Sequence, residues 1–550
     1  MTAPTTVDAS IRTSWVPMIG LFLAQILMSY NVSALPVSLG GMVETFGVPP
    51  TDVSTAIVTY GLVVAALVML GAKIGQRVGW VPMFRIVVAL FAVSALLMIF
   101  APTVEYVIAA QAMAGAAAAI IVPSLVALIA ENYRGRQQET AIGSLGSARA
   151  LAGVSAFLIG GTLATLVGWR QVFVVVLILA VAVFVLSFWL RGLPGNPAIK
   201  IDLVAAALIG FGIVALTLGV NNLNNWGIVL ARPGAPFDIL GLSPAPLLIL
   251  IGLVLAQLFF LWTRRRTKTG KVPLVSLSVF GSSRERAAVY AMFIVVGLEA
   301  ALNFSIPLYI QIVQGRTPFD TSLAMLPFNL TVFVTATVVV RFYRRFPPRV
   351  IGMFGFGLTT IALLWLAFVV TNNWETLPTI LGLFVFGVGQ GALVTLVFNV
   401  LVTASPKELA GDVGSVRGTT QNLASAVGTA VSGALLIGIL SLNVVSALAE
   451  HPQLTPELVS QVDLDSINFV SNDRLDDVLT EQTDATPEQV DAAVALNEQA
   501  RLSALKLGLL ILAGVSALAI VPASRLPRFR PGEVPESVAT GEATKSDPAV

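Results

Sequence analysis

The stretch AIGSLGSARALAGVSAFLIGGTLATLVGWRQVF (141–173) is apolar enough and long enough to cross a bilayer, which takes about 20 residues. It nevertheless carries Arg149, and helical spacing places Gly153, Ala156 and Gly160 on the same face as this arginine. Small residues allow helices to pack closely in lipid. A charge in the middle of a membrane helix costs about 2.5–3.5 kcal/mol on insertion scales, and it faces a partner or a wet cavity. The stretch therefore predicts a packed membrane helix beside a polar cavity.

The composition extends this interpretation to the whole chain. Of 550 residues, 56% are hydrophobic and only 11% are charged, against about 25% charged in soluble domains. The chain has no cysteine, which excludes disulfides, thiolate-bound zinc and iron–sulfur sites. Its only histidine, His451, lies in a polar stretch, so a buried histidine base is excluded. We expect a polytopic membrane protein that has no cofactor and no metal site and is not an enzyme.

Apolar windows between charged or Pro/Gly-rich breaks predict fourteen spans, the first being an uncleaved helix rather than a signal peptide. They are 15–37, 53–74, 82–101, 104–130, 141–166, 172–190, 202–221, 245–263, 287–312, 321–341, 350–370, 376–403, 412–441 and 502–522.

The distribution of basic residues predicts the orientation of these spans. Most of the 32 lysines and arginines fall on one side if both termini are cytoplasmic, as the positive-inside rule requires. The basic linker within 264–286 is then cytoplasmic. The acidic segment 442–501 lies outside, either as a cap or partner surface or as a solvated, partly helical loop.

The order of the spans predicts four regions. Residues 1–192 form an N-terminal six-helix bundle, and 193–285 hold two additional transmembrane helices and a cytoplasmic linker. Residues 286–523 form a C-terminal six-helix bundle that contains the extracytoplasmic insertion 442–501. The tail 524–550 is rich in Pro, Gly, Ser and charged residues, which predicts a disordered cytoplasmic segment.

Several short motifs, in this order and spacing, resemble the major facilitator superfamily and its fourteen-span drug:proton antiporter branch. The resemblance covers nearly the whole chain. The matching residues are Ala34-Leu35-Pro36, the loop AKIGQRVGWVPMFR (72–85), Gly160-Gly161, Gly168-Trp169-Arg170, Phe173, Pro307-Leu308-Tyr309, Gln311, Gly315, Leu326-Pro327, Gly387-Val388-Gly389 and Val427-Gly428-Thr429-Ala430.

This resemblance implies a fold and a set of site residues. The fold is all-α, with two six-helix bundles and two extra transmembrane helices between them. The cavity is lined by spans one, four, nine and twelve, whose amide side chains are Gln25, Asn31, Gln111, Asn303, Gln390 and Asn399. Residues in the matching loop and helix motifs, together with an arginine and a glutamine early in the thirteenth span, are expected to act in gating or conformational change: Arg77, Gly79, Gly160, Gly161, Arg417 and Gln421.

The chain also departs from the family's pattern. Leu27 stands where the branch has a first-span acid, Gln76 stands where the loop has an aspartate, and Gln111 stands where the fourth span has an arginine. Ala156-Phe157 replaces the Gly-Pro of the fifth-span motif. The fourth-span arginine is linked to proton transfer in the family. These substitutions therefore weaken the inference from the resemblance to the usual proton-coupling scheme and to drug antiport.

Glu299 in the ninth span is then the best candidate for proton coupling, because a carboxyl group in a low-dielectric site readily binds and releases protons. The alternative for Glu299 is a structural ion pair or a wet vestibule. Arg149 has three interpretations that the sequence leaves open. It holds an anionic substrate, pairs with Glu299 across the cavity, or extends to the cytoplasmic headgroups.

These observations predict a secondary active transporter that exports hydrophobic or amphiphilic small molecules by alternating access, with proton coupling. The alternatives are a lipid exporter or an uncoupled carrier, and, less favoured, a membrane-embedded enzyme or scaffold. The expected partners are the small-molecule substrate, which includes lipid as a possibility, together with protons and membrane lipids, and no nucleic acid. We expect a monomer in the plasma (inner) membrane.

Overall fold

The computed structural model describes residues 14–133, 135–277, 283–339, 342, 345–403, 410–450, 480 and 486–527. Within these ranges every regular element is a helix, and the only β pairing consists of isolated bridges around Leu242. The helices are α1 (Val16–Phe46), α2 (Pro50–Val78), α3 (Trp80–Ile99), α4 (Val104–Asn132), α5 (Gly135–Ser155), η1 (Ala156–Gly160), α6 (Gly161–Leu166), α7 (Trp169–Leu186), η2 (Ser187–Trp189), α8 (Leu203–Asn221), α9 (Leu223–Trp226), α10 (Pro244–Lys268), α11 (Ser283–Leu308), η4 (Tyr309–Val313), α12 (Pro318–Val338), α13 (Pro348–Val369), α14 (Leu377–Thr403), α15 (Ala410–Glu450), α18 (Pro487–Leu518) and α19 (Ile520–Ala523).

The described part of the chain contains 13 helices that are long and apolar enough to cross a membrane. They coincide with thirteen of the fourteen predicted spans, and the remaining prediction, 412–441, falls on α15. This helix of 41 residues is rich in Gly, Ser and Thr and packs among the others. The predicted all-α polytopic fold is therefore confirmed.

Glycines allow several of these helices to approach closely. A Cβ atom added at Gly71 of α2 would lie 2.6 Å from the carbonyl oxygen of Ala119 on α4. One added at Gly428 of α15 would lie 2.4 Å from the carbonyl oxygen of Gly297 on α11. Because lipid supplies no hydrophobic force between helices, close packing at small residues holds the bundle together.

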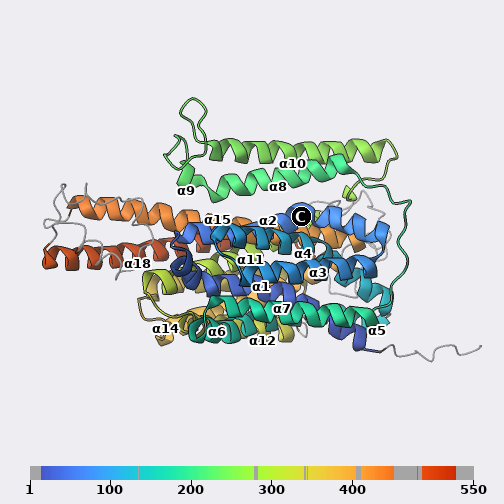
Figure 1. The fold of residues 1–550 in the computed structure, drawn as a ribbon, viewed down its shortest axis with the longest axis horizontal. Helices are drawn as coiled ribbons and strands as arrows, with labels where there is room; N and C mark the ends of the chain where they lie inside the picture. Colours follow the sequence, from blue (N-terminus) through green and yellow to red (C-terminus); the bar gives the residue numbers. More distant parts are fainter. Residues whose placement is uncertain are drawn as a thin grey trace, which may run out of the picture.

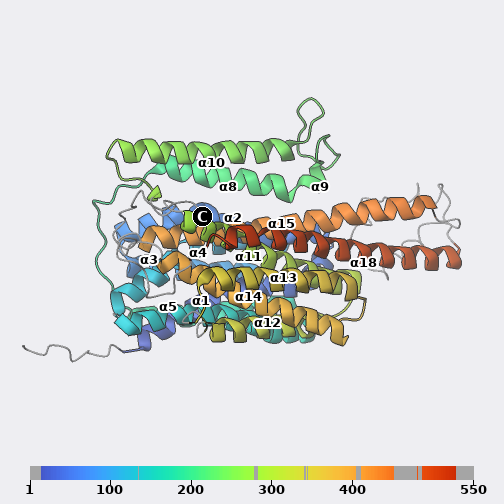
Figure 2. The same ribbon diagram turned by 180° about the vertical axis from the view of Figure 1, so that it is seen from behind.

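The two ends of the bundle differ, and we name them here. At one end α15 and α18 continue side by side beyond the other helices, and α9 lies at this end too (Figures 1 and 2). We call it the extension end. The opposite end carries the chain between α7 and α8 and the chain that follows α10 (Figure 1). We call it the linker end.

The paired helices of the extension end were only partly predicted. The expected spans end at 441 and begin at 502, whereas α15 runs to Glu450 and α18 begins at Pro487. At its start Thr486 caps α18 in a capping box with Gln489. Residues 451–479 and 481–485 of the predicted outer segment, and 528–550 of the predicted tail, lie outside the described residues.

The two additional helices, α8 and α10, form a hairpin along one side of the bundle (Figures 1 and 2). Only α8 has extensive contacts with the bundle, through α2 and α15. The hairpin is fastened at the linker end by Asp202, which is 2% exposed. Its carboxylate accepts hydrogen bonds from Ala205 N (3.2 Å) and Trp262 Nε1 (3.2 Å) and pairs with Arg266 Nε (3.1 Å).

Asp202 should therefore have a large effect on stability. Breaking a buried pair by removing one partner typically costs about 3–5 kcal/mol. We expect Asp202→Ala to lower the thermal unfolding temperature of the purified protein clearly. Asp202→Asn should lower it less, because the amide oxygen still accepts from Ala205 N. Unfolding followed by tryptophan fluorescence measures this, and an unchanged transition in the alanine variant would contradict the assigned role.

Candidate functional site

We call α1 to α7 the N-terminal group of helices and α11 to α19 the C-terminal group. An ion pair joins the two groups in the middle of their spans. Arg149 Nη2 on α5 lies 3.1 Å from Glu299 Oε2 on α11. The two side chains are 27% and 19% exposed, so neither is sealed away. The prediction left three interpretations of Arg149 open, and the structure shows the pairing with Glu299. An ion pair that bridges two groups of helices can break when the groups separate or when Glu299 takes up a proton.

The fold brings α5 to this position through small residues. A Cβ atom added at Gly153, one turn after Arg149, would lie 3.4 Å from Asn329 Oδ1 on α12. One added at Gly161 would fall within the side chain of Ser322, also on α12. Between these contacts the helix widens into the π-turn η1. Gly153, which belongs to the predicted face of small residues, thus packs against α12, and so does Gly161, which lies outside that face.

Two of the predicted cavity amides have buried atoms with no protein partner among the described residues. Asn303, one turn beyond Glu299, has its Oδ1 atom buried in this way. Gln390 on α14 is 0% exposed, and neither its Oε1 nor its Nε2 atom has a partner. An unsatisfied buried polar group costs about 1–3 kcal/mol. Such atoms are ready to bond water or a polar group of a substrate.

The other predicted amides are differently engaged. Asn31 Nδ2 donates to Gln111 Oε1 at 2.9 Å, which joins α1 to α4 at a fully buried position. Gln25 Nε2 donates to Ser29 Oγ at 2.9 Å within α1. Asn399 lies in α14, but its side chain is outside the described part of the chain. In this state the Asn31–Gln111 pair holds two helices together.

The predicted gating residues are spread along the bundle. Arg77 is exposed at the linker end, and Gly79 has φ +106°, a conformation that favours glycine. The chain after α7 packs on this turn, since a Cβ atom at Gly79 would lie 3.1 Å from Gly195 N. Arg417 and Gln421 are partly buried in α15.

A further predicted gating residue, Gly160, lies on α1's side of the fifth span. An added Cβ atom there would lie 3.5 Å from the Tyr30 hydroxyl and 3.1 Å from a methyl group of Val172. Gly160 therefore packs within the N-terminal group of helices, whereas its neighbour Gly161 packs on α12 of the C-terminal group.

At the linker end a second ion pair crosses between the groups. Lys73 Nζ on α2 lies 3.2 Å from Asp412 Oδ1 at the start of α15. The other carboxylate oxygen of Asp412 accepts a hydrogen bond from Ser276 N at 2.9 Å. Asp412 thus connects α2, α15 and the chain that follows α10.

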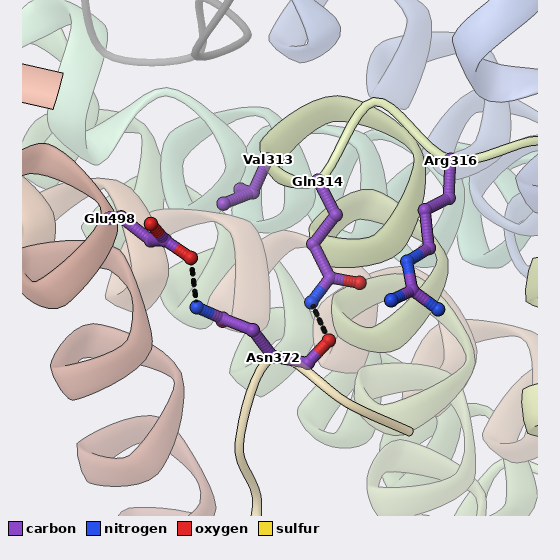
Figure 3. Close-up of a pocket in the computed structure, with 5 residues that line it drawn as sticks. All are labelled: Val313, Gln314, Arg316, Asn372 and Glu498. Atoms are coloured by element: carbon purple, nitrogen blue, oxygen red, sulfur yellow. Dashed lines mark hydrogen bonds between the residues drawn. The ribbon is translucent and has the colours of Figure 1, made fainter. Parts of the chain in front are cut away.

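A small cavity of about 190 Å³ opens at the extension end. It is lined by Val313, Gln314, Arg316, Asn372 and Glu498, which come from η4 and the turn after it, the α13–α14 connection and α18 (Figure 3). Asn372 bonds to Glu498 on one side and, through its carbonyl, to Gln314 on the other. The sequence analysis did not identify this cluster. The one feature that pointed to it was Asn372-Asn373, which separates the predicted spans 350–370 and 376–403.

Comparison with known proteins places this geometry in a family. Residues 21–429 match the Major Facilitator Superfamily. The chain is similar to the probable actinorhodin transporter of Streptomyces coelicolor, with 26% identity over 75% of this chain and 70% of the relative. It is similar to the multidrug efflux pump LfrA of Mycolicibacterium smegmatis, with 24% identity over 80% and 84%. It is also similar to the cephamycin export protein CmcT of Amycolatopsis lactamdurans, with 25% identity over 74% and 82%.

Solved structures agree on the fold. The human organic anion transporter MFSD10 superposes with a TM-score of 0.54 at 12% identity, covering 92% of this chain and 99% of that one. An inward-facing bacterial homolog of the lysosomal transporter Spinster superposes with a TM-score of 0.55 at 14% identity, covering 91% and 96%. The helical architecture and the sequence match lead to one conclusion: this chain belongs to the Major Facilitator Superfamily.

Proposed function

We propose that this protein is a secondary active transporter that exports hydrophobic or amphiphilic small molecules by alternating access. The observation that carries the proposal is the Arg149–Glu299 ion pair, which joins the two helix groups in the middle of the spans. The relatives named as an efflux pump and an export protein support the direction of transport. We also propose that the chain has four regions, with boundaries after residues 192, 285 and 523, and that the protein is a monomer.

We further propose that transport is proton-coupled through Glu299. A proton on this carboxyl group and an ion pair with Arg149 exclude each other, because protonation removes the negative charge. Proton binding would therefore loosen the contact between the helix groups. The amides of Asn303 and Gln390 supply uncharged polar contacts for a substrate, and the predominantly apolar spans suit an amphiphile.

The rival hypotheses are a lipid exporter, an uncoupled carrier and a membrane-embedded enzyme. Among the described residues no group of three His, Cys, Asp or Glu side chains is placed to hold a metal ion. Membership of a transporter superfamily favours transport over catalysis.

Transport in cells tests the proposal directly. Cells that express the protein should accumulate less of at least one dye in a panel of fluorescent amphiphiles than cells without it. Lipid extracted with the purified protein, together with undiminished accumulation of every dye, would favour the lipid exporter instead.

The proposed orientation places the linker end in the cytoplasm and the extension end outside the plasma membrane. Because the chain has no cysteine, single cysteines report orientation without background. We expect Phe237→Cys, in the exposed loop beyond α9, to react with a membrane-impermeant maleimide in intact cells. Lys271→Cys, after α10, should react only after permeabilisation. Labelling of Lys271→Cys in intact cells would contradict this orientation.

A further inference from the structure

The side chain of Gln311 reaches from the C-terminal helices to the backbone of α1. Its Oε1 atom accepts a hydrogen bond from Gly40 N at 2.8 Å, and its Nε2 atom donates to the carbonyl oxygen of Pro36 at 3.0 Å. Gly40 and Pro36 are four residues apart, so one amide holds both ends of one turn of α1. Gln311 is 6% exposed, which makes these bonds a dry contact between the two helix groups.

The neighbouring glycines of α1 show that this approach is specific. A Cβ atom at Gly40 would lie 3.0 Å from Gln311 Oε1, so a side chain there would press on the amide and shift it by a few tenths of an ångström. A Cβ atom at Gly41 would instead lie 3.1 Å from the indole of Trp169, which belongs to the N-terminal group. Gly40 thus faces a side chain of the C-terminal group, whereas Gly41 faces a side chain of its own N-terminal group.

The turn that carries Gln311 is fixed by hydrogen bonds to the α13–α14 connection. It is the π-turn η4, which follows Pro307 at the end of α11. The Tyr309 hydroxyl donates to Asn372 Oδ1 at 2.6 Å, and Gln314 Nε2 donates to the carbonyl oxygen of Asn372 at 2.7 Å. Asn372 in turn bonds to Glu498 of α18. Gln311 therefore projects from a turn that is fixed to the C-terminal helices on both sides.

A second contact closes the same end. Phe319 N at the start of α12 donates to Thr165 Oγ1 of α6 at 3.1 Å. The extension end is thus held together at α1 with η4 and at α6 with α12, and both contacts join the N-terminal to the C-terminal group.

We propose that Gln311 is the latch of the extension end: its two hydrogen bonds to α1 stabilise the closed state, and both must break before this end opens. The inference rests on the proposed alternating access for its meaning in transport. The latch itself is a property of the conformational equilibrium and can be measured without a substrate. Gln311 acts by positioning α1, because both of its hydrogen bonds are to the backbone of that helix.

Gln314 supplies a matched control. It also donates one hydrogen bond and accepts one, from Trp374 Nε1 at 3.1 Å, but both partners belong to the C-terminal helices. Methionine has a similar length and forms neither bond. Gln311→Met removes the contact between the groups. Gln314→Met removes two bonds within one group and leaves the Tyr309–Asn372 bond to hold η4.

The experiment measures the separation of the groups by electron paramagnetic resonance. Spin labels are placed at Glu44→Cys, at the end of α1, and Glu375→Cys, in the α13–α14 connection, where both side chains are exposed. In Gln311→Met we expect the ratio of wide to narrow separations to rise about tenfold, equivalent to about 1.4 kcal/mol. Gln314→Met should leave the ratio within about twofold. An unchanged ratio in Gln311→Met, or an equal rise in both variants, would overturn the latch.

Gly40→Ala provides a second test if the methionine variant folds poorly, because the added methyl group presses on the amide oxygen at 3.0 Å and strains both hydrogen bonds. It should widen the separation in the same direction, and no widening would count against the latch. Transport assays separate the two proposals. A widened separation in a protein that moves no amphiphile would support the latch and contradict the proposed function.

Discussion

Replacing Arg149 with alanine is expected to lower transport at least tenfold while membrane insertion stays normal. The change leaves the carboxylate of Glu299 without its partner 3.1 Å away, in the middle of the spans. An uncompensated buried charge costs several kcal/mol, although the partial exposure of this pair reduces the penalty. Arg149→Lys should recover part of the activity, since lysine restores the charge with a different hydrogen-bonding geometry. Dye efflux, normalised to the amount of protein in the membrane, measures the effect.

The double variant Arg149→Ala/Glu299→Gln separates a structural pair from a functional one. If the pair only holds the helices together, removing both charges should restore transport. If Glu299 works in the cycle, transport should stay low. Full activity in the single alanine variant would make Arg149 a residue that extends to the headgroups, and the central pair would lose its proposed role.

Glu299→Gln is expected to block gradient-driven transport and to leave substrate binding within a fewfold of the wild type. Glutamine resembles the protonated carboxyl group and cannot release a proton, so the cycle loses its exchangeable charge. Exchange of labelled for unlabelled substrate, which needs no net proton movement, should continue. Binding and flux measured on the same preparation give the result. Undiminished pH-driven flux in this variant would favour an uncoupled carrier.

The spans and the central pair could be predicted because both follow from the cost of polarity in lipid. Apolar windows of the right length leave few alternatives to a membrane helix. Only a few charges lie within those windows, so Glu299 had few possible partners, and Arg149 was one of them. The sequence could not choose between that pairing and extension to the headgroups, because the choice depends on how α5 is rotated against α11.

The contacts that sequence reasoning missed depend on rotation and register. Gln311 was noticed as part of a motif, but the π-turn η4 changes the face on which it lies, and a regular helical wheel cannot show that. The Asn31–Gln111 bond required two helices to present both amides at one depth. Arg501, assigned to the polar outer segment, is 2% exposed in α18, which packs along α15.

The role of Asp202 could be predicted only in part, because its partners are distant in the sequence. Its helix-capping position was readable in principle, since an aspartate before an apolar run is a common helix start. Its pairing with Trp262 and Arg266 depends on α10 folding back over α8, and nothing local to Asp202 indicates that return.

We propose above that a proton gradient drives export through this protein. The purified chain in liposomes, with a dye that cells expressing it exclude and an imposed pH gradient, tests that claim most directly. We predict dye movement that requires the gradient, stops when a protonophore collapses it, and is absent in Glu299→Gln. Movement at the same rate without a gradient, or with the protonophore present, would contradict proton-driven export.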